Sequence, residues 1–387
     1  MKARAVCTID LDALARNLAE IRLLVGASVR ICAVVKADAY GHGAVPVSRA
    51  LVAAGVDHLA VACLDEALEL RGAGISSPIL VFGGIAAEEA PRAIELDLTP
   101  VVWSTVAARD LAEHVPPGRR LRVHLEVDTG MHRVGADVAS VAALTAALVE
   151  GPFDLEGLMS HLACADLPDH PSVAVQMQRF EEATRRVAAA GGRPRIRHLA
   201  HSAGLLTESR THLDMVRPGL LLYGCLPHPR FATRIRVAPV MTLRTRIAQI
   251  VNAAPGEGVG YGHRFVAARP TRLAALAIGY GQGYPRSLSQ GGSVLVRGCH
   301  APVAGAVSMD HVTVDVTEVP GAAEGDEVVL WGRDRGADAA DPRPDRVREI
   351  DVMELAARAG TIGYELLTRV GGRVERVTER GSAGGRE

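Results

Sequence analysis

The chain has 387 residues, which is long for one average domain and favours two. Hydrophobic residues make up 48% and charged residues 22%, an ordinary composition for a globular protein. The formal net charge of −1 gives no electrostatic reason to expect nucleic acid or an anionic membrane as a partner.

Cysteine usage and the N-terminus point to the cytoplasm. The six cysteines are scattered without a C-x-x-C pair, so we expect buried, reduced thiols. No long apolar core follows the first basic residues, so we expect no signal peptide, and no apolar run reaches membrane-spanning length. We therefore expect a cytoplasmic protein, and no metal site is predicted.

The first two-thirds of the chain alternates short apolar runs with helical patterns, such as Val45–Ala54, Asp65–Arg71, Val138–Val149 and Val173–Ala190. This alternation predicts a parallel sheet, because parallel strands need crossover connections. Eight strands favour a closed (β/α)8 barrel over residues 1–235, with sites at the carboxyl ends of its strands. An open doubly wound sheet is the alternative, weakened because no G-x-G-x-x-G follows the first strand. The expected strands are Ile31–Lys36, His58–Cys63, Pro78–Phe82, Leu98–Trp103, Leu121–Val127, Leu155–His161, Arg195–His201 and Leu213–Arg217.

The sequence pattern changes near Arg236: after this residue, few helical patterns separate the apolar runs. Residues 236–387 are therefore predicted to form a mostly β domain, with which the first eight or so residues pair. Gly332–Arg346 is expected to be an exposed loop, Asp351–Ala359 a helix and Gly381–Glu387 a disordered tail. The expected strands are Val237–Val251, Thr271–Ile278, Ser293–Val296, His311–Val316 and Glu327–Leu330.

Lys36 closes the apolar first strand of the predicted barrel, in the segment AVVKADAYGHG. A lysine is costly to bury in such a place. A desolvated lysine has a lowered pKa and forms Schiff bases with aldehyde cofactors. The alternative is a lysine whose ammonium group reaches solvent at the barrel mouth.

Three further strand ends carry polar or small residues. His161 ends the sixth strand, Ser202 follows the seventh, and Arg217 with Gly219 follows the eighth. Barrels often bind phosphate after strands seven and eight. Taken singly, these residues fit a core histidine, a helix cap and a structural ion pair. Facing one mouth together with Lys36, they favour a phosphate-bearing aldehyde cofactor.

Over nearly its whole length the sequence resembles the bacterial alanine racemases. The matching segments are CTIDLDALARNL, AVVKADAYGHG, EVDTGMHRVG, HLACAD, MVRPGLLLYG, GVGYGHRF, AIGYGQGYPR, AVSMDHVTVDV and GTIGYELLTRVGGRVER. The resemblance implies a barrel that bears pyridoxal 5'-phosphate (PLP), a C-terminal β domain and a head-to-tail homodimer with shared active sites. It also implies interconversion of L-alanine and D-alanine by two bases on opposite faces of the α-carbon.

The resemblance assigns a role to each matching residue. Lys36 is the Schiff-base lysine and one proton-transfer base, and Tyr261 of the partner subunit is the other base. Arg217 faces the pyridine nitrogen, and His161 lies between Arg217 and the Tyr261 hydroxyl. The remaining positions match phosphate contacts (Tyr40, Ser202, Gly219, Leu220 and Tyr364), substrate-carboxylate contacts (Arg133 and Met309) and residues of the pocket and its entrance (Tyr280 and Asp310).

Two positions depart from the family pattern. Ser308 replaces a common cysteine, and Glu126 replaces a lysine that is carbamylated in many members. We expect the Glu126 carboxylate to hold Arg133 in place of that carbamate.

Other functions remain open at this point. A PLP decarboxylase of related fold would carry an acidic group at the pyridine nitrogen, where this chain has Arg217. A non-catalytic PLP-binding barrel would lack the second domain and a residue like Tyr261. Serine or broad-specificity racemisation is the alternative to alanine, which is favoured because Tyr364 matches a bulky residue that limits the pocket.

Overall fold

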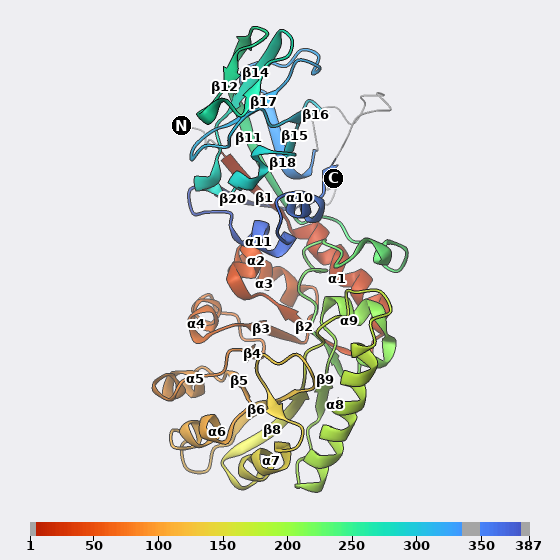
Figure 1. Ribbon diagram of the computed structural model, residues 1–387. Coiled ribbons are helices and arrows are strands. Elements are labelled where there is room, and N and C mark those ends of the chain that lie inside the picture. The colour runs from red at the N-terminus through yellow and green to blue at the C-terminus, as the bar shows by residue number, and fades with distance from the viewer. Residues whose placement is uncertain (1–4, 335–348, 381–387) are drawn as a thin grey trace, which may run out of the picture.

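A computed structural model describes residues 5–334 and 349–380 of the chain. It consists of a barrel and a mostly β domain stacked end to end (Figure 1). The loop expected over Gly332–Arg346 lies largely outside the described residues, and the expected tail Gly381–Glu387 lies wholly outside them. No helix in the described part of the chain is both long enough and apolar enough to cross a membrane.

The first unit is the predicted parallel barrel with its helices outside. Its strands hydrogen-bond in the order β10-β2-β3-β4-β5-β6-β8-β9. A parallel bridge between His201 and Arg217 joins the two ends of this order, so the sheet is nearly closed. The strands are β2 (Arg30–Val34), β3 (His58–Val61), β4 (Ile79–Val81), β5 (Thr99–Val102), β6 (Leu121–Asp128), β8 (Phe153–Met159), β9 (Ile196–His198) and β10 (Met215–Val216); β7 (Ala136–Asp137) pairs with β6.

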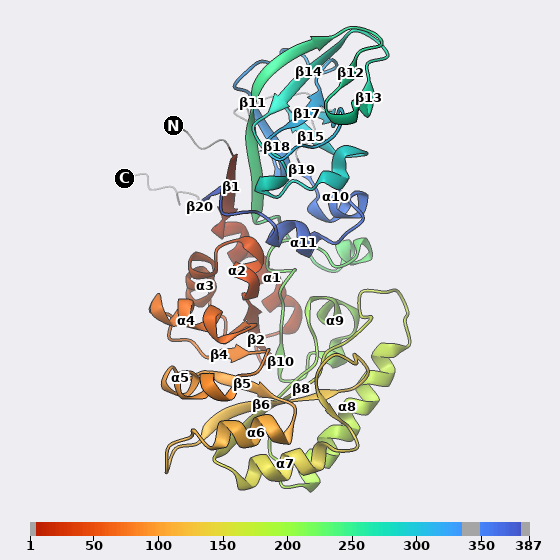
Figure 2. The same ribbon diagram turned by 60° about the vertical axis from the view of Figure 1, so that its left-hand side comes forward.

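Each strand buries apolar side chains because the outer helices cover it (Figure 2). The first helix begins where the Asp10 carboxylate accepts hydrogen bonds from the amides of Asp12 and Ala13. Helix α8 is the longest, as its pattern predicted. The helices are α1 (Leu11–Val25), α2 (Lys36–Gly41), α3 (Ala44–Ala53), α4 (Leu64–Gly72), α5 (Ala90–Glu95), α6 (Thr105–Ala112), α7 (Val141–Glu150), α8 (Ser172–Ala189) and α9 (Ser202–Thr207).

The second unit is mostly β, as predicted, and its strands are antiparallel apart from the β1–β20 pair. Strand β1 (Ala5–Asp10) lies between β11 and β20 in this domain's sheet, so these residues belong to the second unit although they precede the barrel in sequence. The other strands are β11 (Met241–Ala253), β12 (Gly258–Val259), β13 (Phe265–Val266), β14 (Thr271–Leu276), β15 (Ser293–Val296), β16 (Cys299–Pro302), β17 (Val312–Asp315), β18 (Glu327–Arg333), β19 (Glu349–Ile350) and β20 (Glu375–Glu379).

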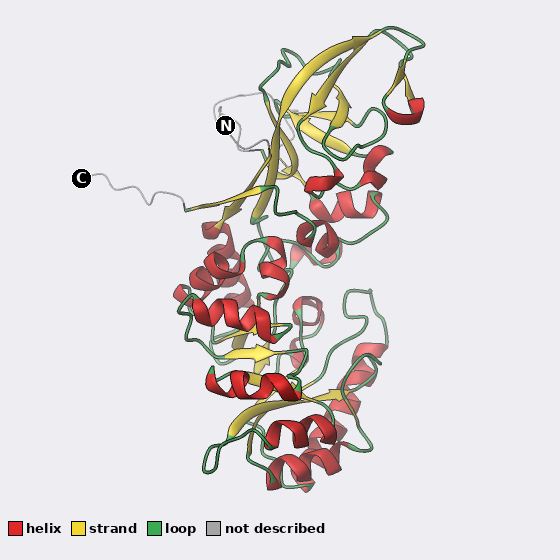
Figure 3. Ribbon diagram, turned by 90° about the vertical axis from the view of Figure 1, so that its left-hand side faces the viewer, coloured by secondary structure: helices red, strands yellow, loops and turns green. Residues whose placement is uncertain are grey.

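Two short helices of this domain, α10 (Val352–Arg358) and α11 (Gly363–Thr368), lie between its sheet and the barrel, as Figure 2 labels them. Figure 3 shows helices (red) between the yellow strands of the two units. They bring the second domain to the barrel mouth. All six cysteines are unpaired, but they are not all buried as expected: Cys7, Cys32 and Cys225 are buried, whereas Cys63 is exposed.

Candidate active site

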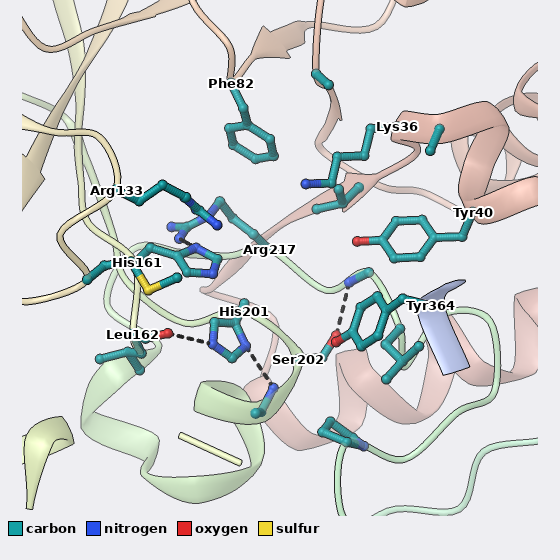
Figure 4. A pocket seen from close by; sticks show the side chains of 18 of the residues that line it. Lys36, Tyr40, Phe82, Arg133, His161, Leu162, His201, Ser202, Arg217 and Tyr364 are labelled. Atoms are coloured by element: carbon teal, nitrogen blue, oxygen red, sulfur yellow. Dashed lines mark hydrogen bonds between the residues drawn. The ribbon is translucent and has the colours of Figure 1, made fainter. Parts of the chain in front are cut away.

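A cavity of about 1120 Å³ opens at the carboxyl ends of the barrel strands and is bounded on one side by α11. Figure 4 shows its side chains converging from several strands. Sequence analysis placed most of the candidate cofactor-binding residues at these strand ends. The lining includes the candidates Lys36, Tyr40, Glu126, Arg133, His161, Ser202, Arg217, Gly219, Leu220 and Tyr364.

Lys36 follows the end of β2 and begins α2, whose backbone turns in the left-handed sense and is not an ordinary α-helix. The strand stops at Val34, and the four residues Ala37–Tyr40 all have left-handed conformations, with φ between 53° and 56°. L-residues disfavour this conformation by about 1–2 kcal/mol each, so several in succession must be held by their surroundings. The turn brings Lys36 and Tyr40 into the same cavity.

Contacts from both domains hold this turn. The Glu66 carboxylate accepts hydrogen bonds from the Ala37 amide (2.7 Å) and the Ala62 amide (2.7 Å). The Arg376 guanidinium donates to the Gly41 carbonyl at 2.9 Å. A Cβ at Gly41 would lie 2.2 Å from a carbonyl oxygen of α11, so only glycine permits this approach.

Hydroxyl groups and backbone amides gather at one end of the cavity. Ser202 Oγ accepts hydrogen bonds from the Gly219 amide (3.0 Å) and the Leu221 amide (3.3 Å). A Cβ at Gly219 would lie 2.5 Å from the Tyr40 hydroxyl oxygen, so that hydroxyl lies directly against the glycine backbone. Tyr364 lies beside Tyr40, with ring centroids 5.8 Å apart. Such uncharged donors suit a phosphate group.

Arg217 lies at the opposite, deeper side and is 2% exposed. Its guanidinium donates to the Ser160 carbonyl (2.7 Å), the Leu199 carbonyl (3.3 Å) and His198 Nδ1 (2.8 Å). It also contacts His161 Nδ1 at 3.5 Å. Because guanidinium is donor-only, both histidine nitrogens accept. Burial lowers the pKa of Arg217 to about 10, so it remains charged at neutral pH.

Burial and positive neighbours set the protonation of the other two basic groups. The pKa of Lys36 is lowered by burial and then by Arg133, while Glu66 acts in the opposite direction. The pKa of His161 is lowered well below its usual value by burial and by His201 and Arg217. His161 is therefore neutral, and the Arg217 contact leaves its proton on Nε2. Lys36 has a larger fraction of reactive free amine than an exposed lysine.

Four predicted site residues do not line this cavity. Tyr261 is 73% exposed, on the 261–263 turn between β12 and β13, which Figure 2 shows at the end of the domain away from the barrel. Tyr280 and Met309 are also exposed, and the Tyr280 amide donates to the Ser308 carbonyl at 3.1 Å. Asp310 pairs with Arg373. All four residues belong to the β domain and lie outside the cavity of their own chain.

The expected pair between Glu126 and Arg133 is not formed. Both side chains reach the cavity, but within residues 5–334 and 349–380 neither makes a side-chain hydrogen bond or an ion pair. Glu126 lies on β6 itself, whereas Arg133 follows a turn in which the Asp128 carboxylate accepts hydrogen bonds from three amides. Burial raises the pKa of Glu126 to about 7, although Arg217 and Arg133 oppose this shift.

Sequence reasoning missed other residues of the site. Phe82 and Trp103 line the cavity at the ends of β4 and β5, and their positions after apolar runs were the available signal. His201 also lines it and donates from Nε2 to the Leu162 carbonyl at 3.1 Å. No pattern indicated the buried histidines behind Arg217.

Two family models together cover most of the chain. The model described as "Alanine racemase, N-terminal domain" matches residues 9–227, and "Alanine racemase, C-terminal domain" matches residues 240–378. The chain belongs to the alanine racemase family. Members are isomerases, and this chain is an isomerase of that family. An alanine racemase of Sorangium cellulosum is 43% identical over 376 residues, covering 95% of this chain and 97% of that protein.

Other relatives and solved structures agree with this assignment. An alanine racemase of Syntrophobacter fumaroxidans is 41% identical, covering 94% of each chain. The alanine racemase from D-cycloserine-producing Streptomyces lavendulae superposes with a TM-score of 0.86 at 38% identity, covering 98% of each chain. The Bacillus anthracis alanine racemase with bound L-Ala-P has a TM-score of 0.88 at 31% identity, covering 98% of this chain and 96% of that one. These full-length matches confirm the predicted fold.

The raised pKa of Glu126 has a measurable consequence. Glu126 holds its proton more tightly in the folded than in the unfolded chain, so its contribution to stability is full below pH 4.5 and is lost as pH rises through about 7. At about 1.4 kcal/mol per pKa unit, this amounts to about 3 kcal/mol. Without cofactor, wild-type protein should therefore lose a few degrees more in Tm between pH 5 and pH 8 than Glu126→Gln. Equal losses would show that Glu126 is ionised throughout.

Proposed function

We propose that the protein interconverts L-alanine and D-alanine with PLP as its cofactor. The observation that carries this proposal is the Lys36 amine, with its lowered pKa, in a cavity that has hydroxyl and amide groups suited to a phosphate at one side and Arg217 at the other. The names of the relatives and the bound L-Ala-P in the Bacillus anthracis structure support alanine as the substrate.

The residues of the cavity fit the cofactor. The close approach of the Tyr40 hydroxyl to Gly219 leaves a cradle of donors that a side chain would fill. PLP, when bound, withdraws electrons from the substrate α-carbon and makes its hydrogen acidic. Lys36 would hold the cofactor covalently, and Arg217 would face the ring nitrogen. The phosphate would be held by Tyr40, Ser202, Gly219, Leu220 and Tyr364.

Two bases would carry the proton between the faces of the α-carbon. Lys36 Nζ would exchange a proton on one face, and the Tyr261 hydroxyl on the other. His161, with its proton on Nε2, would donate a hydrogen bond to that hydroxyl and stabilise its ionised form.

We infer that Tyr261 reaches the site from a second copy of the chain. Tyr261 is highly exposed and outside its own cavity, an arrangement that a head-to-tail homodimer with shared sites would explain. The neighbouring segments of the partner's β domain would reach the site together with Tyr261. Met309 would then bind the substrate carboxylate with Arg133 of the barrel, and Tyr280 and Asp310 would line the entrance of the pocket. The cytoplasmic location expected from the sequence stays a prediction.

Substrate size separates alanine from the alternative amino acids. Tyr364 is half-buried in the cavity wall and would limit the space beyond a methyl side chain. A panel of L-amino acids, assayed by chiral chromatography, tests this assignment. Faster racemisation of serine or of larger amino acids than of alanine would contradict it.

Arg217 should control which reaction follows proton removal. An arginine does not plausibly give a proton to the ring nitrogen, which keeps the ring a weaker electron acceptor. Arg217→Glu should therefore slow racemisation by about a hundredfold and raise the fraction of turnovers that end in transamination. Keto acid is measured against racemised product in the same reaction. An unchanged ratio would show that Arg217 does not control reaction specificity.

A further inference from the structure

A chain of buried polar side chains leads away from Arg217 on the side opposite the cavity. His198 Nδ1 lies 2.8 Å from Arg217 Nη1, and His198 Nε2 lies 2.8 Å from His124 Nδ1. His124 Nε2 in turn lies 3.5 Å from Glu156 Oε2. Both histidines are fully buried, and they come from β9 and β6, on either side of β8, which carries Glu156.

The position of each histidine proton follows from the Arg217 end of this series of contacts. A guanidinium only donates, so His198 Nδ1 must accept and its proton sits on Nε2. That proton points at His124 Nδ1, which must accept in turn, so the His124 proton sits on Nε2 and faces Glu156. A proton on either Nδ1 would place two N–H groups against each other. Both histidines are therefore neutral Nε2–H tautomers, consistent with the lowering of their pKa values by burial.

Glu156 ends the chain as a charged acceptor. The close contact with His124 (3.5 Å) lowers the pKa of Glu156 to about 2, with further help from Arg122. Its carboxylate also lies 3.6 Å from Arg195, and its side chain is only 14% exposed. The carboxylate therefore stays ionised across the working pH range and attracts the His124 proton.

Gly157 provides the space for this arrangement. A Cβ at Gly157 would lie 2.4 Å from His124 Nδ1 and 2.5 Å from two ring carbons. No side chain fits beside the ring at that distance, and the φ of Gly157 is not in the left-handed region. The missing side chain at Gly157 therefore lets the His124 ring approach His198. This approach joins the Arg217–His198 pair to the His124–Glu156 pair.

We propose that Glu156 is a positioning residue for Arg217, which it orients through His124 and His198. The ionised carboxylate attracts the outer His124 proton and so stabilises the Nε2–H tautomers that the Arg217 end requires, with a ring nitrogen lone pair facing Arg217 Nη1. Together with the carbonyls of Ser160 and Leu199, this acceptor holds the guanidinium in one orientation toward the cavity. The part of this inference that concerns the reaction rests on the proposed role of Arg217 at the cofactor ring; the tautomers do not depend on it.

The test replaces one carboxylate on β8 and compares it with a matched control. Glu156→Gln should weaken the preference for these two tautomers, because the neutral amide attracts the His124 proton less than a carboxylate does and can also turn its NH2 group toward it. Asp154→Asn removes the same charge from the same strand and also breaks a contact with Arg195 (2.8 Å), but Asp154 makes no hydrogen bond to either histidine in the described structure. Each variant is prepared as holoenzyme with ¹⁵N-labelled histidine.

Two readouts follow. The ¹⁵N shifts of His124 and His198, assigned with single histidine variants, should show neutral Nε2–H tautomers in wild type and in Asp154→Asn, and mixed tautomers in Glu156→Gln. Only in Glu156→Gln should the ratio of keto acid to racemised alanine rise and kcat/KM for racemisation fall about tenfold. A tenfold fall is about the effect of weakening one hydrogen bond to a charged group. Glu156→Asp should recover part of the loss.

The two levels of the proposal fail in different ways. A proton on His198 Nδ1 in the wild-type protein would contradict the proposed series of contacts from Arg217 to Glu156, and no variant is needed for this part of the test. Unchanged tautomers in Glu156→Gln, or a product ratio equal to that of Asp154→Asn, would overturn the role of Glu156. A wild-type protein that racemises no amino acid, yet shows the expected tautomers, would refute the proposed function and leave the tautomer assignment standing.

Discussion

Lys36→Ala should lower racemisation by about 10⁴-fold or more and abolish covalent attachment of PLP. The variant removes both the amine that would hold the cofactor and one of the two proton-transfer bases, and general acid–base catalysis alone accounts for about 10²–10⁴-fold. The lowered pKa of Lys36 and its place in the cavity make it the group that would react with an aldehyde.

The chain offers a clear assignment of the attachment site, because Lys2 and Lys36 are its only lysines. Borohydride reduction of the wild-type enzyme, followed by peptide mapping, should place the pyridoxyl group on Lys36. Lys2→Arg serves as the matched control and should keep both the label and full activity. Label on Lys2 or on the N-terminal amine, with Lys36 unmodified, would refute the central assignment.

Tyr261→Phe should lower racemisation by about 10²–10⁴-fold while leaving PLP bound. The phenolic hydroxyl would exchange the proton on the face opposite Lys36, and phenylalanine keeps the ring but not the proton. Because Tyr261 is exposed and lies outside the cavity of its own chain, a subunit with an intact Tyr261 should be able to supply the missing hydroxyl to the site of another subunit. Retention of the bound-cofactor absorbance separates a catalytic defect from a failure to bind PLP.

Mixing Tyr261→Phe with Lys36→Ala tests where the two bases meet. In a shared-site dimer, each hybrid combines one intact Lys36 with one intact Tyr261 from the other subunit and so has one complete site. Random mixing makes about half of the dimers hybrids, which restores about a quarter of wild-type activity. Differently tagged subunits confirm that hybrids form. Hybrids without activity would show that both bases act from the same chain.

The strand pattern of the barrel was predictable because it depends on local hydrophobicity. All eight expected strands are present, but seven of them end earlier than expected at the functional end, and only β6 does not. The strand expected over Ile31–Lys36 stops at Val34, and that expected over Leu213–Arg217 covers only Met215 and Val216. At the first site the left-handed turn over Ala37–Tyr40 ends the strand, and these residues have no intrinsic preference for such a turn.

The sequence by itself determined the two kinds of domain, the strand ends that bear Lys36, Ser202 and Arg217, and the family. Apolar periodicity and contiguous motifs carry that information, because they depend on residues close together in the chain. Only the tertiary structure decided that Glu126 and Arg133 stay apart and that His198, His124 and Glu156 form a chain behind Arg217. Such contacts join strands far apart in sequence and depend on side-chain direction and on gaps such as the one beside Gly157, which local patterns do not record.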